Sequence, residues 1–221
     1  MKPFLFISLL VACLRPDTLA NDPTWNHGHV TLRSGQTIDG QLSYNWKAEI
    51  LQVRTAAGIT KAFSARNVDS FAYFDGGQNT LRKFSSVELP TSSEMVRPVM
   101  LEECTAGHYT VYRRLRHSKE LLRITRPSLY SNDIELMKDY DNFIYFVVDD
   151  AGNVTDLQQF ERTVWPQMLN DYRPQLTECL RVRQLDPSTT VARLILINQY
   201  NYLREQNPNH ANKPAVILTS Y

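Results

Sequence analysis

Residues 29–44 read HVTLRSGQTIDGQLSY, and this stretch decides the fold. Apolar and polar residues alternate on both sides of Ser34-Gly35, which is typical of two strands joined by a tight turn. The pattern predicts a β-hairpin with one buried face. The predicted core residues of this hairpin are Val30, Leu32, Ile38, Leu42 and Tyr44. Gly40 lies inside the second strand, where a glycine usually marks a bulge or a bend, so we expect the sheet to curl toward a barrel.

Strand patterns continue beyond this hairpin as far as residue 116. Further strands are predicted at residues 49–54, 60–63, 68–74, 82–89, 99–103 and 109–115. Residues 142–148 then form one compact apolar strand. Short strands separated by turn residues are typical of an antiparallel sheet or a small barrel.

The hydrophobic period changes from that of strands to that of helices after residue 153. Thr155 and Gln158 fit a capping box that opens a first helix, which Pro166 kinks or restarts. Pro174 opens a second helix, and Asp186-Pro187 opens a third. The third helix is predicted to bury a face of apolar and polar residues. Its members are Val191, Leu194, Ile195, Asn198 and Tyr202.

The fold class predicted from these patterns is α+β. An N-terminal antiparallel sheet, barrel-like in its curl, is followed by a C-terminal strand and about three helices. The expected organisation is a leader at residues 1–20, a β-rich domain at 21–126, a helical α+β unit at 127–207 and a loosely ordered tail at 208–221.

The first twenty residues have the pattern of a secretory signal peptide. Lys2 precedes an apolar run at residues 4–14, and Thr18 and Ala20 supply the small residues that signal peptidase needs. We expect cleavage after Ala20, because residues 15–20 make a natural polar cleavage region. Residues 10–13 also read as a lipobox, so the alternative is a lipidated Cys13 that anchors the protein to a membrane.

Charge and cysteine content narrow the function classes. The chain has 24 basic and 23 acidic residues, and losing Lys2, Arg15 and Asp17 with the leader makes the two counts equal. A neutral chain lacks the basic face that nucleic-acid binding needs, so we expect no nucleic-acid partner. Cys104 and Cys179 would remain after cleavage, and in an oxidising compartment they are a candidate disulfide. The alternative is two buried thiols.

Four segments resemble a family of secreted proteins of Bacteroidota that has no assigned function. They are residues 28–40 (GHVTLRSGQTIDG), 68–73 (VDSFAY), 101–112 (LEECTAGHYTVY) and 196–201 (LINQYN). The chain departs from the family pattern at Gln36, where the pattern has an acid. The resemblance implies an exported protein and carries no catalytic residues with it. The opening hairpin is also similar to an Sm-like or SH3-like barrel. This similarity is one of fold alone and is no evidence of RNA binding.

Three short clusters are candidates for chemistry. Cys104 and His108 lie close enough in sequence to pair as nucleophile and base of a hydrolase, but strand pairing on one predicted hairpin explains them without catalysis, and we favour that interpretation. His27 and His29 could share a metal ion, but the sequence shows no third ligand at regular spacing, so we interpret them as a polar lead-in to the first strand. Residues 149–153 resemble part of a calcium loop and are interpreted as a polar turn. We therefore expect neither a metal nor a cofactor.

One concentration of basic residues is a candidate patch for an anionic partner. Its members are Arg113, Arg114, Arg116, Lys119, Arg123 and Arg126. On an alternating strand some of these side chains must point to opposite faces, which would spread the patch. The pattern as a whole predicts an exported, non-enzymatic binding or scaffolding protein of the cell envelope or extracellular space. Its expected partner is an envelope protein or a polysaccharide, with membrane contact only if Cys13 is lipidated.

Overall fold

The computed structural model of the chain describes residues 24–90, 95–116 and 140–207. These residues form an α+β fold built on one sheet of ten strands. The strands are β1 (Asn26–Leu32), β2 (Thr37–Asn45), β3 (Ile50–Arg54), β4 (Thr60–Ser64), β5 (Val68–Asp75), β6 (Thr80–Pro90), β7 (Val96–Thr105), β8 (Thr110–Leu115), β9 (Phe143–Val148) and β10 (Val154–Asp156). The helices are η1 (Tyr140–Asn142), η2 (Leu157–Gln159), α2 (Val164–Arg183) and α3 (Thr190–Gln206).

The strand order is β10-β9-β8-β7-β6-β5-β1-β2-β3-β4, and β1 therefore lies between β5 and β2. Every printed neighbour pair is antiparallel, as the sequence pattern predicted. In a flat sheet β4 and β5 would lie about 19 Å apart, at ~4.8 Å per strand. Residues 65–67 alone join them, and four residue steps span at most about 14 Å. The sheet must therefore curl at this end.

The curl does not close into a barrel. Among the described residues β4 pairs with β3 and β5 pairs with β1 and β6, so the sheet ends at β4. The strands curl because two glycines leave room for them. Gly28 and Gly40 lie opposite each other, and a Cβ atom would lie 2.1 Å from the Ala72 carbonyl oxygen at Gly28 and 2.4 Å from that of Arg54 at Gly40. No side chain fits at either position.

The inner face of the sheet carries the main core. One row of opposed residues crosses six strands, from β1 through β5, β6, β7 and β8 to β9. Its members are Val30, Phe71, Phe84, Glu102, Arg113 and Tyr145. The first three are apolar, and the Phe71 and Phe84 rings stack with their centroids 4.3 Å apart. The row turns polar at Glu102, which is buried.

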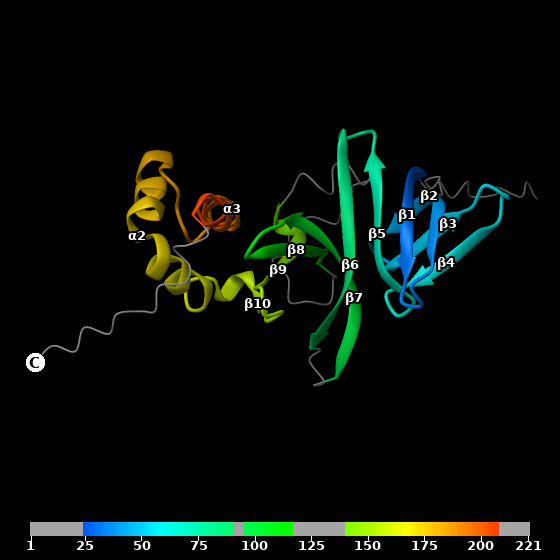
Figure 1. Ribbon diagram of the computed structural model, residues 1–221, viewed down its shortest axis with the longest axis horizontal. Coiled ribbons are helices and arrows are strands. Elements are labelled where there is room, and N and C mark those ends of the chain that lie inside the picture. Colours follow the sequence, from blue (N-terminus) through cyan, green and yellow to red (C-terminus); the bar gives the residue numbers. More distant parts are fainter. Residues whose placement is uncertain (1–23, 91–94, 117–139, 208–221) are drawn as a thin grey trace, which may run out of the picture.

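The helices lie at the far end of the molecule from the curled sheet (Figure 1). α2 and α3 follow β10 and complete the core with buried Met168, Leu176, Leu196 and Tyr200. Two α-helices are described where about three were predicted. The predicted second helix is the C-terminal part of α2, which bends at Tyr172 next to Pro174 because a proline supplies no amide hydrogen. Pro166 does not kink α2, because it lies in the first turn, where amides lack helical partners.

Two details of the predicted helices are wrong. Thr155 belongs to β10, and Asp156 caps the η2 turn instead by accepting a hydrogen bond from the Gln158 amide. In α3 the buried residues are Ala192, Leu196, Ile197, Tyr200 and Asn201. Of the predicted face, Val191, Asn198 and Tyr202 are exposed, and Leu194 and Ile195 are partly buried. The prediction chose this face because polar groups on the buried face weaken its apolar pattern.

The predicted domain boundaries at residues 20, 126 and 208 fall outside the described residues or at their limit. The sheet itself runs through both predicted units, since β8 pairs with β9 from Thr110 opposite Val148 to Leu115 opposite Phe143. One cluster of buried residues likewise extends from Val30 to Tyr200.

Candidate functional site

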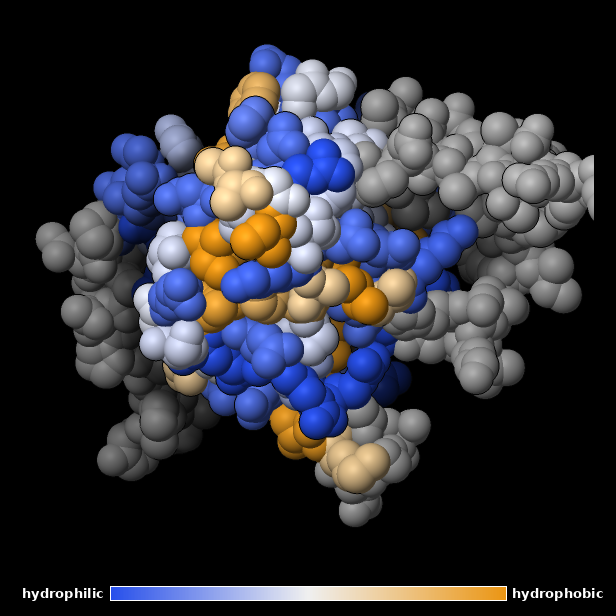
Figure 2. All heavy atoms as spheres, turned by 90° about the vertical axis from the view of Figure 1, so that its right-hand side faces the viewer, coloured by the Kyte–Doolittle hydropathy of each residue, from blue (hydrophilic) through white to orange (hydrophobic). Residues whose placement is uncertain are grey.

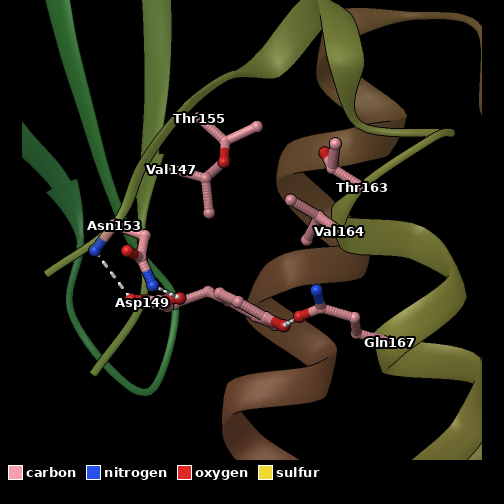
Figure 3. A pocket seen from close by; sticks show the side chains of 8 residues that line it. Val147, Asp149, Asn153, Thr155, Thr163, Val164 and Gln167 are labelled. Carbon is pink, nitrogen blue, oxygen red and sulfur yellow. Dashed lines mark hydrogen bonds between the residues drawn. The ribbon is translucent and has the colours of Figure 1, made fainter. Parts of the chain in front are cut away.

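The most elaborate polar constellation in the described part of the chain lies where the sheet meets the helices. Here the β7–β8 turn, the β9–β10 turn and the start of α2 border a small hollow that is open to solvent (Figure 3). Its lining residues are Tyr109, Val147, Asp149, Asn153, Thr155, Thr163, Val164 and Gln167. Its volume of about 30 Å³ has room for roughly two water molecules and is far below the ~300 Å³ of sites for drug-sized ligands.

An oriented imidazole lies beside the hollow. His108 Nδ1 is hydrogen-bonded to Asp150 Oδ2 across the two turns. The His108 ring also packs against Tyr109 and Tyr200, with centroid distances of 4.8 Å and 5.7 Å. A carboxylate that orients an imidazole is the supporting part of many acid–base sites. In this chain the same contact also joins the two turns.

A second group of bonds links the helices. The Tyr200 hydroxyl donates to Asp171 Oδ2 at 2.5 Å, and Arg204 Nη1 donates to the Tyr200 oxygen at 3.0 Å. Burial, together with the Asp171 hydrogen bond, raises the pKa of Tyr200. The Tyr109 hydroxyl donates to Gln167 Oε1 at 2.6 Å, and burial raises the pKa of Tyr109 to about 12. Both phenols therefore stay neutral donors at physiological pH.

Asn201 ties α3 to the β7–β8 turn. Its Oδ1 accepts from the Tyr109 amide at 3.0 Å, and its Nδ2 donates to the carbonyls of Tyr109 at 2.8 Å and Ala106 at 3.3 Å. Gly107, at φ 145°, makes room for this side chain, since a Cβ there would lie 2.5 Å from Asn201 Cγ. No sequence motif marks this contact, because its members lie more than ninety positions apart.

The Asp149–Asn153 turn uses its own acid to hold itself together. Asp149 accepts from the amides of Ala151 at 3.0 Å and Asn153 at 2.8 Å, and from Asn153 Nδ2 at 2.9 Å. The hydrogen bond from the Asn153 side chain lowers the pKa of Asp149. The turn forms as a closed polar turn between β9 and β10, which is the role interpreted from the sequence.

The structure separates Cys104 from the groups with which it was paired. Cys104 lies in an irregular part of β7, and its thiol approaches the Glu102 carbonyl oxygen at 3.8 Å, while His108 bonds Asp150. The residue as a whole is exposed, yet protein around the sulfur raises the thiol pKa to about 12. A thiolate nucleophile needs the opposite shift. Both Cys104 and Cys179, which lies on α2, are free thiols in the structure, so the candidate disulfide is not formed there.

The three described members of the predicted arginine patch do not gather on one surface. Arg113 points inward, with its side chain 14% exposed, and its Nε donates to Glu102 Oε2 at 2.5 Å. Arg114 is the next residue along β8 and faces the opposite side of the sheet. Arg116 follows the last residue of β8, and its Nη2 donates to the Phe143 carbonyl oxygen at 3.4 Å. Lys119, Arg123 and Arg126 lie outside the described residues, as does Cys13.

Arg113 instead belongs to a buried cluster of ion pairs around Glu102. Glu102 binds Arg113 on one side and Arg82 on the other, where Arg82 Nε donates to Glu102 Oε1 at 2.6 Å. Asp75 lies 3.6 Å from Arg82, and the Trp46 ring lies below its guanidinium at 5.0 Å. Burial alone would lower the pKa of Arg82, but Glu102 outweighs burial and raises it. Sequence analysis missed Arg82, because nothing in its strand marks it as facing inward.

The described structure defines an α+β protein with one open antiparallel sheet and a pair of helices at its end. No family model, curated protein or solved structure matches the chain. None of the described helices is long and apolar enough to span a membrane. In the described ranges the histidine, cysteine and acidic side chains form no ready-made group of three around a metal ion.

Proposed function

We propose that the protein is an exported binding or scaffolding component of the cell envelope or extracellular space. The observation that carries the proposal is the leader pattern of residues 1–20, a basic start followed by a short apolar run and small residues. The resemblance to secreted Bacteroidota proteins of unassigned function supports the same compartment. The expected partner is an envelope protein or a polysaccharide.

The arrangement of polar groups supports a binding role over catalysis. Asn201, Glu102 and Asp171 each make bonds that join separate elements, so their chemistry is engaged in holding the fold. The curled end of the sheet offers a broad surface. Figure 2 looks onto this end and shows hydrophobic residues gathered within a hydrophilic surround. Ile59 and Phe74, 55% and 50% exposed, are among the large apolar side chains at this end.

The mass of the mature chain, measured on protein from its native cells, tests export. We expect a chain that begins at Asn21 in the exported fraction, and replacing Ala20 with a bulky residue, Ala20→Phe, should leave the leader attached. Recovery of the complete chain, Met1 included, as the stable cytosolic form would overturn the proposal.

A lipid anchor is the second candidate, and the lipobox at residues 10–13 is the observation that favours it. In that case the mature chain begins at a lipidated Cys13, and Cys13→Ser releases the protein from membranes. If cleavage follows Ala20, Cys13→Ser changes neither the mass nor the fractionation of the mature protein. The same pair of variants therefore decides between the two forms.

Affinity capture from the native envelope tests the binding role. The exported form is cross-linked in intact cells, purified, and compared with a Phe74→Ser variant that alters the exposed surface at the curled end of the sheet. We expect one envelope protein or polysaccharide to be enriched with the native chain and reduced with the variant. Recovery of no envelope component above an exported control protein would contradict a binding role.

A further inference from the structure

Two histidines face outward from β1 on the same side. The strand alternates so that His27 and His29 are exposed while Val30 is buried. Gly28 separates them, and β5 packs so tightly against it that a Cβ would lie 2.1 Å from a backbone oxygen. The register of β1 is therefore fixed, and the two imidazoles project from positions about 7 Å apart along one rigid strand.

The neighbouring strand places oxygen donors opposite both imidazoles. In the β1–β2 pairing His29 lies opposite Asp39, and His27 lies opposite Gln41. Asp39 is exposed, and Gln41 is partly exposed on the same outer side. Side chains directly opposite on antiparallel strands have Cβ atoms about 5 Å apart. The sequence analysis found no third ligand because Asp39 lies on the other strand of the hairpin. Regular spacing along one strand does not reveal it.

These side chains are unengaged. Within residues 24–90, 95–116 and 140–207, the side chains of His27, His29 and Asp39 make no hydrogen bond, ion pair or ring contact. The acids and histidine at the sheet–helix junction differ in this respect, since Asp149, Asp150 and His108 all hold turns together. Donor atoms that carry no structural bond are free to coordinate.

We propose that His27, His29 and Asp39 bind a divalent transition-metal ion of the zinc, nickel or copper type. Imidazole nitrogen is a preferred ligand of these ions, and a carboxylate completes a three-ligand set on which water or the Gln41 amide oxygen fills the remaining position. In the described structure these three side chains are not gathered into one group. The ion gathers them by rotation about their χ angles, which exposed side chains undergo readily.

The proposal is tested on the untagged full chain as its cells deliver it. This protein is titrated with Zn²⁺ and, in a separate experiment, with Co²⁺. We expect saturation at one ion per chain and a rise in the unfolding temperature on adding Zn²⁺. Loss of even an indirect partner of a metal ligand weakens binding by ~10–100-fold, so His27→Gln, His29→Gln and Asp39→Asn should each weaken it by at least about tenfold.

The matched control is Asp69→Asn, which removes an exposed carboxylate from β5 of the same curled sheet. It should bind the ion as the native chain does. Because the three ligands are exposed, their variants should keep the native unfolding temperature in chelator, which separates lost binding from lost folding. Absence of saturable binding would overturn the proposal, and so would binding that His27→Gln and His29→Gln leave unchanged.

Discussion

Glu102 lies midway along the row of opposed residues on the inner face of the sheet, between Phe84 and Arg113. Its carboxylate receives one arginine from β6 and one from β8, at 2.6 Å and 2.5 Å. The Arg113 guanidinium also lies over the Phe143 ring, 4.3 Å from its centroid. A buried charge is tolerated only when partners satisfy it, so this cluster fixes which residues of β6, β7 and β8 lie opposite one another.

Glu102→Gln should destabilise the protein strongly. The change leaves the largely buried Arg113 without a counter-charge and leaves Arg82 only its longer pair with Asp75, and breaking a buried ion pair in this way costs about 3–5 kcal/mol. Urea unfolding measures the effect. The control Glu103→Gln removes only the pair with Lys83, whose side chain is 54% exposed, and should cost less than ~1 kcal/mol. Equal losses for the two variants would contradict the role assigned to Glu102.

Gly28→Ala should also destabilise the protein strongly, for a steric reason. The new methyl group would lie 2.1 Å from the Ala72 carbonyl oxygen, and a backbone oxygen inside a sheet cannot move away. Overpacking of this kind costs about 3 kcal/mol or more. Gly76→Ala is the control, since a Cβ at that turn position meets nothing within 4 Å. Thermal unfolding of both variants measures the loss of stability. An unchanged melting temperature for Gly28→Ala would show that the two strands can move apart.

Among the elements, α3 is the one that fastens the helical end to the sheet. It buries one face against the core and, through Asn201, bonds the backbone of the β7–β8 turn. The same turn carries His108, whose bond to Asp150 joins it to the β9–β10 turn. Removing one side chain on α3 therefore affects two turns of the sheet.

Asn201→Ala should loosen this junction before it unfolds the sheet. The substitution leaves the buried amide and carbonyl of Tyr109 without partners, at a cost of about 2–3 kcal/mol. Hydrogen exchange should show faster exchange of the Tyr109 amide, with the β1–β5 strands less affected. Asn198→Ala, an exposed position on the same helix, should leave exchange unchanged. Uniform acceleration over the whole sheet would instead show that the junction and the sheet unfold together.

At the scale of the whole molecule, one core cluster extends from β1 to α3, and many of its members are tyrosines. Burial raises the pKa of Tyr44, Tyr145 and Tyr200, and raises that of Tyr109 to about 12. A group whose pKa is higher in the folded state stabilises the fold below its unfolded pKa and stops doing so as pH rises through its folded pKa.

The protein should therefore keep its full stability up to about pH 10, where tyrosine ionises in unfolded chains, and lose it steeply above that pH. Circular dichroism and tyrosinate absorbance, followed over an alkaline titration, measure the two events. We expect the buried tyrosines to ionise only as the fold is lost. Ionisation of most of them near pH 10 with an unchanged circular dichroism spectrum would contradict the burial described here.

Much of the sheet could be predicted from the sequence, because each strand records its buried face in its own alternation. The hairpin around Ser34-Gly35 and the compact strand at residues 142–148 are clear examples, and both are confirmed. The helices were harder to predict. α3 buries Tyr200 and Asn201, whose polarity made the opposite face look more apolar. The cluster of Arg82, Glu102 and Arg113 depends on the pairing register of three strands, which no local pattern contains.

The position of β1 between β2 and β5 has a consequence for synthesis on the ribosome. β1 leaves the ribosome before the other described strands and can pair with β2 soon afterwards. Its other edge stays unpaired until β5 (Val68–Asp75) has been made. During that interval the nascent chain offers a bare row of amides and carbonyls, which is a template for association with a second chain. Products that end before residue 68 should therefore aggregate, whereas β5 seals this edge once it has left the exit tunnel.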